Sequence, residues 1–197
     1  MSQKRPAPHE VFTPGAPIDK REFFAGRVDQ ISRVIETIPH PGRHPIIFGQ
    51  RGVGKTSLAN ILNELLPSVW TVKISCDASD TFESLWWNRI LEKASVRFKE
   101  KAFGFSDEEE TKILTLKSLV GHDKPVSPAG VANVLTNIKS KSILIFDEFD
   151  RVSDSPTKSQ MADLIKNVSD NNRLVTIVLV GVGSSITDLI GEHPSIQ

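Results

Sequence analysis

The chain has 197 residues, of which 39% are hydrophobic and 24% charged, and these proportions are ordinary for one folded domain. Lysine and arginine number 24 together, as do aspartate and glutamate, so net charge provides no general attraction to nucleic acid or to a membrane. The chain contains no apolar stretch long enough to span a bilayer and no signal-peptide core, and its one cysteine cannot form an internal disulfide. These properties predict a cytoplasmic domain without a membrane partner.

The first predicted segment, residues 1–17, contains four prolines that leave little room for regular structure. We expect it to be a flexible lead before a domain that covers residues 18–197. Near the start of that domain stands the segment Phe24-Ala25-Gly26-Arg27. An amphipathic helix is predicted directly after it, because apolar residues recur at helical spacing. These residues are Val28, Ile31, Ile35 and Ile38.

A glycine-rich segment follows a short apolar run at residues 45–48, which predicts a buried strand. The segment reads Gly49-Gln50-Arg51-Gly52-Val53-Gly54-Lys55-Thr56, the complete phosphate-loop pattern G-x-x-x-x-G-K-[ST]. Glycines allow a tight loop whose backbone amides point at an anion. Lys55 supplies positive charge for the β- and γ-phosphates, and the Thr56 hydroxyl is placed to bind Mg²⁺. Ser57 opens a predicted helix to Leu66, whose positive dipole end adds to this anion site.

A second group of polar residues ends another apolar run. Residues 69–75 predict one strand, and residues 142–146 predict a second that is followed by Asp147 and Glu148. A strand as apolar as 142–146 belongs in the centre of a parallel sheet, and ligands of such sheets bind at the carboxyl ends of the strands. Asp147 is therefore the expected partner of Mg²⁺, through water, and Glu148 is placed to act as general base on an attacking water.

The region between these motifs is predicted to be mainly helical. Apolar residues at every fourth position predict one long amphipathic helix over residues 82–98. Residues 103–124 are predicted to form a surface insertion of uncertain order. The pairs Ser127-Pro128 and Ser155-Pro156 each predict a helix that begins with serine as N-cap and proline in the first turn.

A further apolar run, residues 174–180, predicts a fourth strand and is followed by a short helical pattern at residues 186–190. Ser184 and Ser185 lie between the two, and one interpretation is that they cap this short helix. Because strands alternate with helices, the chain is predicted to have an α/β fold with a mostly parallel central sheet and helices on both faces.

These motifs resemble the Walker A and Walker B elements of P-loop ATPases. The Asp147-Glu148 pair is similar to the branch in which a catalytic glutamate follows the Walker B aspartate. The segment from Phe24 to Arg27 resembles the F-x-G-R segment that AAA+ and STAND ATPases of the archaeal and origin-recognition type carry ahead of their phosphate loop. The resemblance implies a three-layer P-loop NTPase fold, with the Walker B strand beside the phosphate-loop strand and the 174–180 strand next.

The same resemblance implies ATP and Mg²⁺ as cofactors, with Phe24, Gly26 and Arg27 against the adenine. It implies a second interpretation of Ser184, which stands where these proteins have a polar "sensor 1" residue near the γ-phosphate. The capping interpretation stays open beside it. AAA+ domains continue to a fifth strand, an arginine finger and a helical lid, so we expect the chain to be a fragment truncated before the lid, with weak turnover alone.

Two functions follow from the resemblance. The first is an ATP-binding and hydrolysing AAA+-like domain that couples nucleotide state to conformational change or assembly, as a homo-oligomer of the full-length protein. The alternative is a STAND-type nucleotide-gated signalling switch with slow or no turnover. A GTPase is disfavoured because no N-K-x-D segment follows the last strand, and the Asp147-Glu148 pair disfavours a small-molecule kinase. The charge balance indicates neither a nucleic-acid nor a protein partner, and both stay open.

Overall fold

The computed structural model describes residues 28–38, 40–52, 54–66, 69–93, 95–101, 109–119 and 126–190. In these ranges, helical segments lie between most successive strands of the chain, and the predicted lead lies outside them. In chain order the elements are α2 (Val28–Thr37), β1 (Ile46–Gly49), α3 (Lys55–Leu65), β2 (Trp70–Ser75), η2 (Ser84–Ile90), β3 (Ser95–Lys101), β4 (Glu109–Thr115), η3 (Leu116–Leu119), α4 (Pro128–Leu135), β5 (Ser142–Asp147), η4 (Phe149–Arg151), α5 (Ser155–Asn171), β6 (Val175–Val182) and α6 (Ile186–Ile190).

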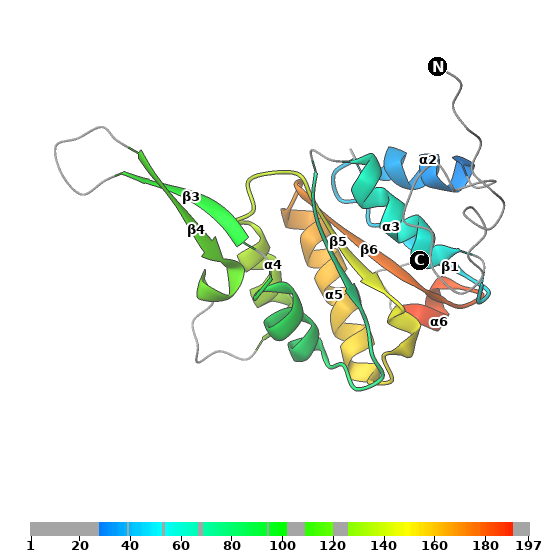
Figure 1. The fold of residues 1–197 in the computed structure, drawn as a ribbon. Helices are drawn as coiled ribbons and strands as arrows, with labels where there is room; N and C mark the ends of the chain where they lie inside the picture. Colours follow the sequence, from blue (N-terminus) through cyan, green and yellow to red (C-terminus); the bar gives the residue numbers. More distant parts are fainter. Residues whose placement is uncertain are drawn as a thin grey trace, which may run out of the picture.

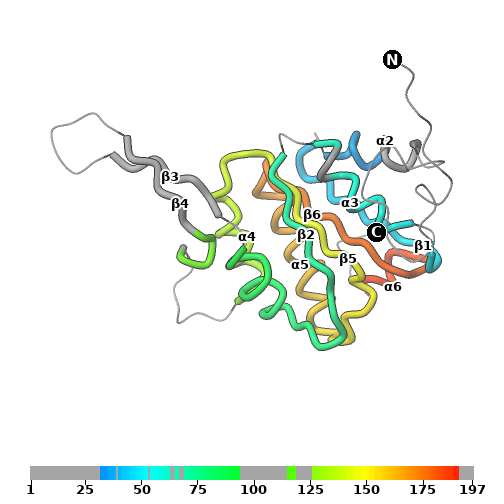
Figure 2. Tube along the Cα trace, viewed as in Figure 1, coloured from blue at the N-terminus to red at the C-terminus, as the bar shows by residue number. Residues whose placement is uncertain are grey.

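The central sheet has four parallel strands in the order β1-β6-β5-β2 (Figure 2). The four predicted strands are confirmed, with ends that differ by at most two residues. Their predicted order was wrong: β5, which carries the Asp-Glu pair, does not lie beside β1, because β6 lies between them. A helical crossover lets the next parallel strand join on either side of its predecessor, so periodicity along the chain does not settle the order.

Helices cover both faces of the sheet, which confirms the predicted three-layer α/β fold (Figure 1). Successive residues of β5 point to opposite faces, as the strand pleat requires. Ile143 and Ile145 pack in a cluster with α2 and α3. Leu144 and Phe146 pack in the other cluster, with η2, α4, α5 and α6. All six residues of β5 are buried, so the strand has protein on both sides.

The prediction of one long helix over residues 82–98 was wrong. The helical part is a π-helix, η2, in which the Leu91 amide donates to the Trp86 carbonyl at 2.7 Å. This wider winding suits an apolar repeat of four residues rather than 3.6. The chain then turns and forms β3, where V-R-F-K alternates as a strand does.

Strand β3 pairs antiparallel with β4 in a separate two-stranded sheet. The predicted surface insertion therefore contains a strand, β4, and the short helix η3, while residues 102–108 and 120–125 lie outside the described ranges.

The helix caps agree with one prediction and correct another. Ser127 caps α4, since its hydroxyl accepts the Gly130 N–H at 3.1 Å. The cap of α5 is Asp154 rather than Ser155, and its carboxylate accepts the Thr157 N–H at 2.9 Å. The carboxylate also accepts the Thr157 hydroxyl, a second bond that a serine cap in the next position would not provide. No helix in the described part of the chain is long and apolar enough to cross a membrane.

Candidate nucleotide-binding site

The glycine-rich loop connects β1 to α3. Gly52 and Gly54 both adopt φ of +79°, the left-handed region that costs other residues about 1–2 kcal/mol. A Cβ atom at either position would meet nothing within 4 Å, so conformation rather than space requires glycine here. Gly54 is also the N-cap of α3, so the loop runs directly into the positive end of that helix dipole. This geometry is what an anion-binding loop needs.

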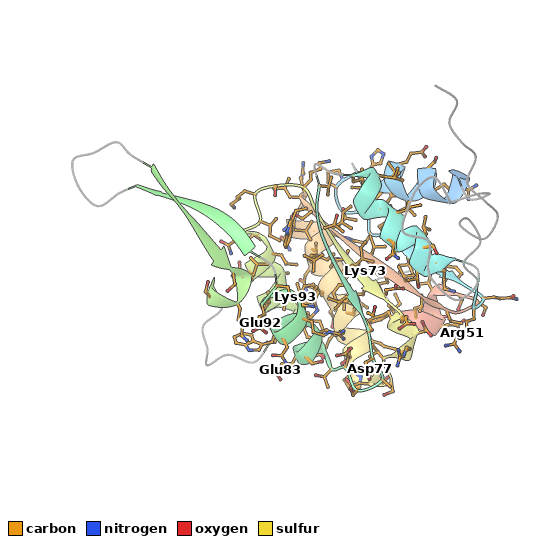
Figure 3. All side chains as sticks on the ribbon, viewed as in Figure 1. Arg51, Lys73, Asp77, Glu83, Glu92 and Lys93 are labelled. Carbon is orange, nitrogen blue, oxygen red and sulfur yellow. The ribbon has the colours of Figure 1, made fainter. Side chains whose placement is uncertain are left out.

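Lys55 lies over the loop that precedes it. The residue is 9% exposed, and Nζ donates to the carbonyls of Gly49 at 2.9 Å and Gln50 at 2.7 Å. The ammonium is therefore held at the same loop whose amides are predicted to bind phosphate. Ser57 is buried in the first turn of α3, whereas Arg51 is exposed at the edge of the molecule (Figure 3).

Asp147 is the last residue of β5 and contacts both Thr56 and Lys73. Its side chain is only 2% exposed, and Oδ1 accepts the Thr56 hydroxyl at 3.3 Å and the Glu148 amide at 3.0 Å. The other carboxylate oxygen, Oδ2, lies 2.9 Å from Nζ of Lys73 on β2. Strand β5 is not adjacent to β1. The segment that follows the loop nevertheless contacts Asp147, because Thr56 lies at the start of α3.

Glu148 has an unusual backbone for its residue type, with φ of 56° and ψ of 35°. Among the described residues other than glycine, no other has a positive φ. The left-handed conformation turns the chain from β5 into η4, and such strain concentrates at functional sites. The Glu148 carboxylate accepts a hydrogen bond from Nη1 of Arg151 at 3.0 Å.

Arg151 also reaches the loop after β2. Its Nη2 donates to Oδ2 of Asp77 at 3.2 Å, so one guanidinium joins two carboxylates. The bond to Glu148 is the main cause that raises the pKa of Arg151 above its ordinary value. For Asp77, the hydrogen bond from the Ser79 amide is the main cause that lowers the pKa of its carboxyl.

Ser184 lies beside the phosphate loop and also takes part in a cap. Its hydroxyl donates to Oδ2 of Asp188 at 2.8 Å, while the Asp188 amide donates to the Ser185 hydroxyl at 3.3 Å. The hydrogen bond that the Ser184 amide donates is the main cause that lowers the pKa of the Asp188 carboxyl. The structure therefore has the capping arrangement, with Ser185 as the capping hydroxyl. The same Ser184 lines a cleft of about 490 Å³ with Phe48, Gly49, Gln50, Val182 and Gly183.

Some predicted site residues lie outside the described ranges, namely Phe24, Gly26, Arg27 and Val53. Among the described residues, no group of three or more His, Cys, Asp or Glu side chains could hold a metal ion. A magnesium site here would therefore rest on Thr56, Asp147 and phosphate oxygens. Mg²⁺ keeps several waters and uses few protein ligands, so the hydroxyl and carboxylate present fit this ion.

The sequence predictions missed Lys73, Asp77 and Arg151, all of which contact the acidic pair or its partners. Lys73 had a signal in the sequence, because it is a charged residue inside an otherwise uncharged predicted strand. Arg151 stands three residues after Glu148, a spacing at which side chains on a helical turn meet. Asp77 had no comparable signal, since its partner Arg151 is 74 positions away.

A parallel sheet with a glycine-rich phosphate loop after one strand and an Asp-Glu pair after another defines the class of P-loop NTPases. Within that class, the chain belongs to the AAA domain family (AAA_22), whose profile matches residues 40–190. No curated protein sequence matches the chain significantly.

Two of the solved structures that are similar to it are both archaeal proteins. The Walker-type ATPase PABY2304 of Pyrococcus abyssi has a TM-score of 0.52 and 19% identity, over 85% of this chain and 48% of that one. The Aeropyrum pernix ORC1 protein, in complex with DNA, has a TM-score of 0.50 and 17% identity, over 95% of this chain and 44% of that one. At these identities the likeness shows the fold alone, and this chain spans just under half of each protein. The family match confirms the resemblance to AAA ATPases, and the chain shares its fold with these two proteins, an archaeal Walker-type ATPase and an ORC1 protein.

Proposed function

We propose that this chain binds ATP with Mg²⁺ and hydrolyses it, and that its nucleotide state controls conformation or assembly in a larger protein. The observation that carries the proposal is the 3.3 Å contact between Thr56 Oγ1 and Asp147 Oδ1. It brings together the ends of the two motifs, 91 positions apart, in the arrangement that a metal-bound triphosphate needs.

Each part of the site has one task in this proposal. The loop amides bind the phosphates, and Lys55 neutralises charge on the β- and γ-phosphates. Thr56 and Asp147 would hold Mg²⁺, which when bound supplies positive charge to the phosphate oxygens. Glu148 accepts the proton of the attacking water. Phosphoryl transfer depends mainly on such positioning and charge neutralisation. Ser184 lines the cleft beside the loop, where it follows β6 closely in the chain.

A nucleotide-gated switch with slow turnover is the second candidate. Two observations favour it: Lys55 is bonded to the loop's own carbonyls, and Glu148 is paired with Arg151. Both side chains must leave these partners before they act on a nucleotide, which slows turnover and lets the bound nucleotide set the conformation. Oligomeric state measured with ADP and with a non-hydrolysable ATP analogue separates the two candidates. ATP turnover is measured alongside. Continuous turnover favours the ATP-hydrolysing domain, and a single assembly step on nucleotide binding favours the switch.

The macromolecular partner is the least constrained part of the proposal. The ORC1 structure contains DNA, but the net charge of zero in this chain provides no matching electrostatic support. We propose a homo-oligomer of the full-length protein as the working assembly, with DNA as a variable in the turnover assay. Stimulation of turnover by DNA would assign the nucleic-acid partner, and its absence would direct the search to proteins.

Calorimetric titration with ATP and GTP, each with Mg²⁺ and with EDTA, tests the proposal directly. We expect ATP to bind and Lys55→Ala to abolish binding, because the variant loses the charge that faces the phosphates. Lys93→Ala is the matched control, since Lys93 is exposed in the turn after η2 (Figure 3). If the folded protein binds no purine triphosphate under either condition, the proposed function is wrong. A preference for GTP would contradict the assignment of ATP.

A further inference from the structure

Lys73 is a charged side chain on β2, an edge strand of the central sheet. It lies opposite Ile145 in the register with β5, and its two strand neighbours are Val72 and Ile74. Its side chain is 26% exposed and points to the face that α3 covers, where Nζ donates to Oδ1 of Asn60. An ammonium group in this position loses hydration, which is unfavourable unless an oppositely charged group lies beside it.

That partner is Asp147. Nζ of Lys73 lies 2.9 Å from Oδ2, and the Asp147 side chain is 2% exposed. The other oxygen, Oδ1, accepts the neutral donors of Thr56 and Glu148. Within the described ranges, the ion pair of Asp147 is therefore with Lys73. An unpaired carboxylate buried this deeply is strongly unfavourable, so the Lys73 ammonium supplies the counter-charge that Asp147 needs next to a phosphate-binding loop.

We propose that Lys73 is the resident counter-charge of Asp147 and sets how strongly nucleotide binding depends on Mg²⁺. The inference rests on the proposed function, because it concerns the same site. In the absence of metal, Lys73 cancels the charge of Asp147, so a triphosphate on the loop does not face an uncompensated carboxylate. The chain's own ammonium thus does part of what the metal does for this carboxylate.

The proposal predicts a specific pattern of affinities. If Lys73 loses its charge, Asp147 repels the triphosphate in EDTA, and binding there weakens. In Mg²⁺ the dication replaces the missing charge, so affinity changes much less. The measured quantity is the ratio of the Kd in EDTA to the Kd in Mg²⁺. We expect Lys73→Met to raise this ratio at least about tenfold above that of the wild-type protein.

The titration uses the whole chain and a fluorescent ATP analogue, with Lys93→Met as the control for loss of one lysine charge. Lys93 is exposed, so its variant should keep the wild-type ratio. An equal ratio in Lys73→Met and the wild-type protein overturns the proposal. If Lys73→Met does not fold, Lys73→Gln takes its place, because the amide keeps a hydrogen-bond donor without the charge.

A second measurement does not need nucleotide and keeps the two proposals separate. It is a double-mutant cycle measured by thermal melting without nucleotide. The four proteins are the wild-type protein, Lys73→Met, Asp147→Asn and the double variant. We expect Lys73→Met to lower the Tm strongly when Asp147 is charged, and only weakly when Asp147→Asn has already removed that charge. Additive changes in Tm overturn the counter-charge role. Failure of the wild-type protein to bind any triphosphate, with a coupled cycle, contradicts the proposed function and the nucleotide part of this inference but leaves the counter-charge role of Lys73 standing.

Discussion

Arg151 holds Glu148 by an ion pair in which Nη1 lies 3.0 Å from Oε2, and its second guanidinium nitrogen binds Asp77 at 3.2 Å. Asp77 follows β2, the strand on the far side of β5 from β1. The carboxylate that we propose as general base is therefore held on the side of the sheet away from the phosphate-loop strand. One of its oxygens is also occupied by the Arg151 guanidinium.

Replacement of Arg151 should release this carboxylate. We expect Arg151→Gln to raise the rate of ATP hydrolysis while leaving ATP affinity unchanged. Both side chains are about half exposed, 47% for Arg151 and 44% for Glu148. Solvent weakens an ion pair that is exposed to this extent, so the increase should be at most about fivefold. Phosphate release under single-turnover conditions is the measurement.

Arg173→Gln is the control for the arginine variant, since Arg173 is exposed just before β6, at the opposite end of the sheet. The control should hydrolyse ATP at the wild-type rate. A slower Arg151→Gln variant, with unchanged affinity and Tm, would show that the ion pair positions Glu148 productively instead.

Replacement of Glu148 tests its role as general base. Glu148→Gln keeps nearly the same shape but does not accept the proton of water, so we expect ATP to bind while hydrolysis falls by about 10²–10⁴-fold. Binding is measured by titration and turnover by phosphate release. Glu83→Gln, an exposed glutamate just before η2, is the matched control. Normal hydrolysis by Glu148→Gln would assign the base to another group.

Protonation of His44 should make the fold less stable at acidic pH. His44 Nδ1 accepts the Ile177 amide at 2.9 Å, and burial lowers the pKa of the imidazole to about 4. Because the unfolded chain binds the proton more readily, the stability from neutral His44 is present above about pH 6.5 and is lost as the pH falls toward 4. The full loss is about 3 kcal/mol.

Urea unfolding at pH 7 and pH 5 measures this effect. We expect His44→Asn to show a smaller change between the two pH values than the wild-type protein, because asparagine keeps an acceptor and does not titrate. The exposed His40 provides the control variant His40→Asn, which should behave as the wild-type protein does. Equal pH dependence in His44→Asn and the wild-type protein would contradict the prediction.

The local elements were predictable because their signals lie within a few residues. The β5 strand was predictable from its unbroken apolar run, and the α4 cap from Ser127 with the proline after it. Where a neighbouring signal competed, the prediction failed. Asp154 caps α5 in place of Ser155, and the apolar repeat over residues 82–98 crosses from a π-helix into β3.

The candidate site was predictable in part for the same reason. Lys55 and Thr56 have a fixed spacing to the glycines, so the loop could be placed from the sequence. The side chains that surround the acidic pair could not be predicted from the sequence, since they come from other helices, strands and loops. Lys73 reaches Asp147 only because β2 lies beside β5, and Arg151 reaches Asp77 only because the loop after β2 lies beside η4.

The sequence alone determined that this chain has a phosphate loop between a strand and a helix, and an acidic pair after an apolar strand, because short-range spacing decides backbone conformation and chemical type. Tertiary structure alone decided that β6 separates the two motif-bearing strands, that Lys73 faces Asp147, and that Arg151 holds Glu148. Those contacts depend on the order of strands in the sheet. That order follows from packing between distant segments, which leaves no periodic trace along the chain.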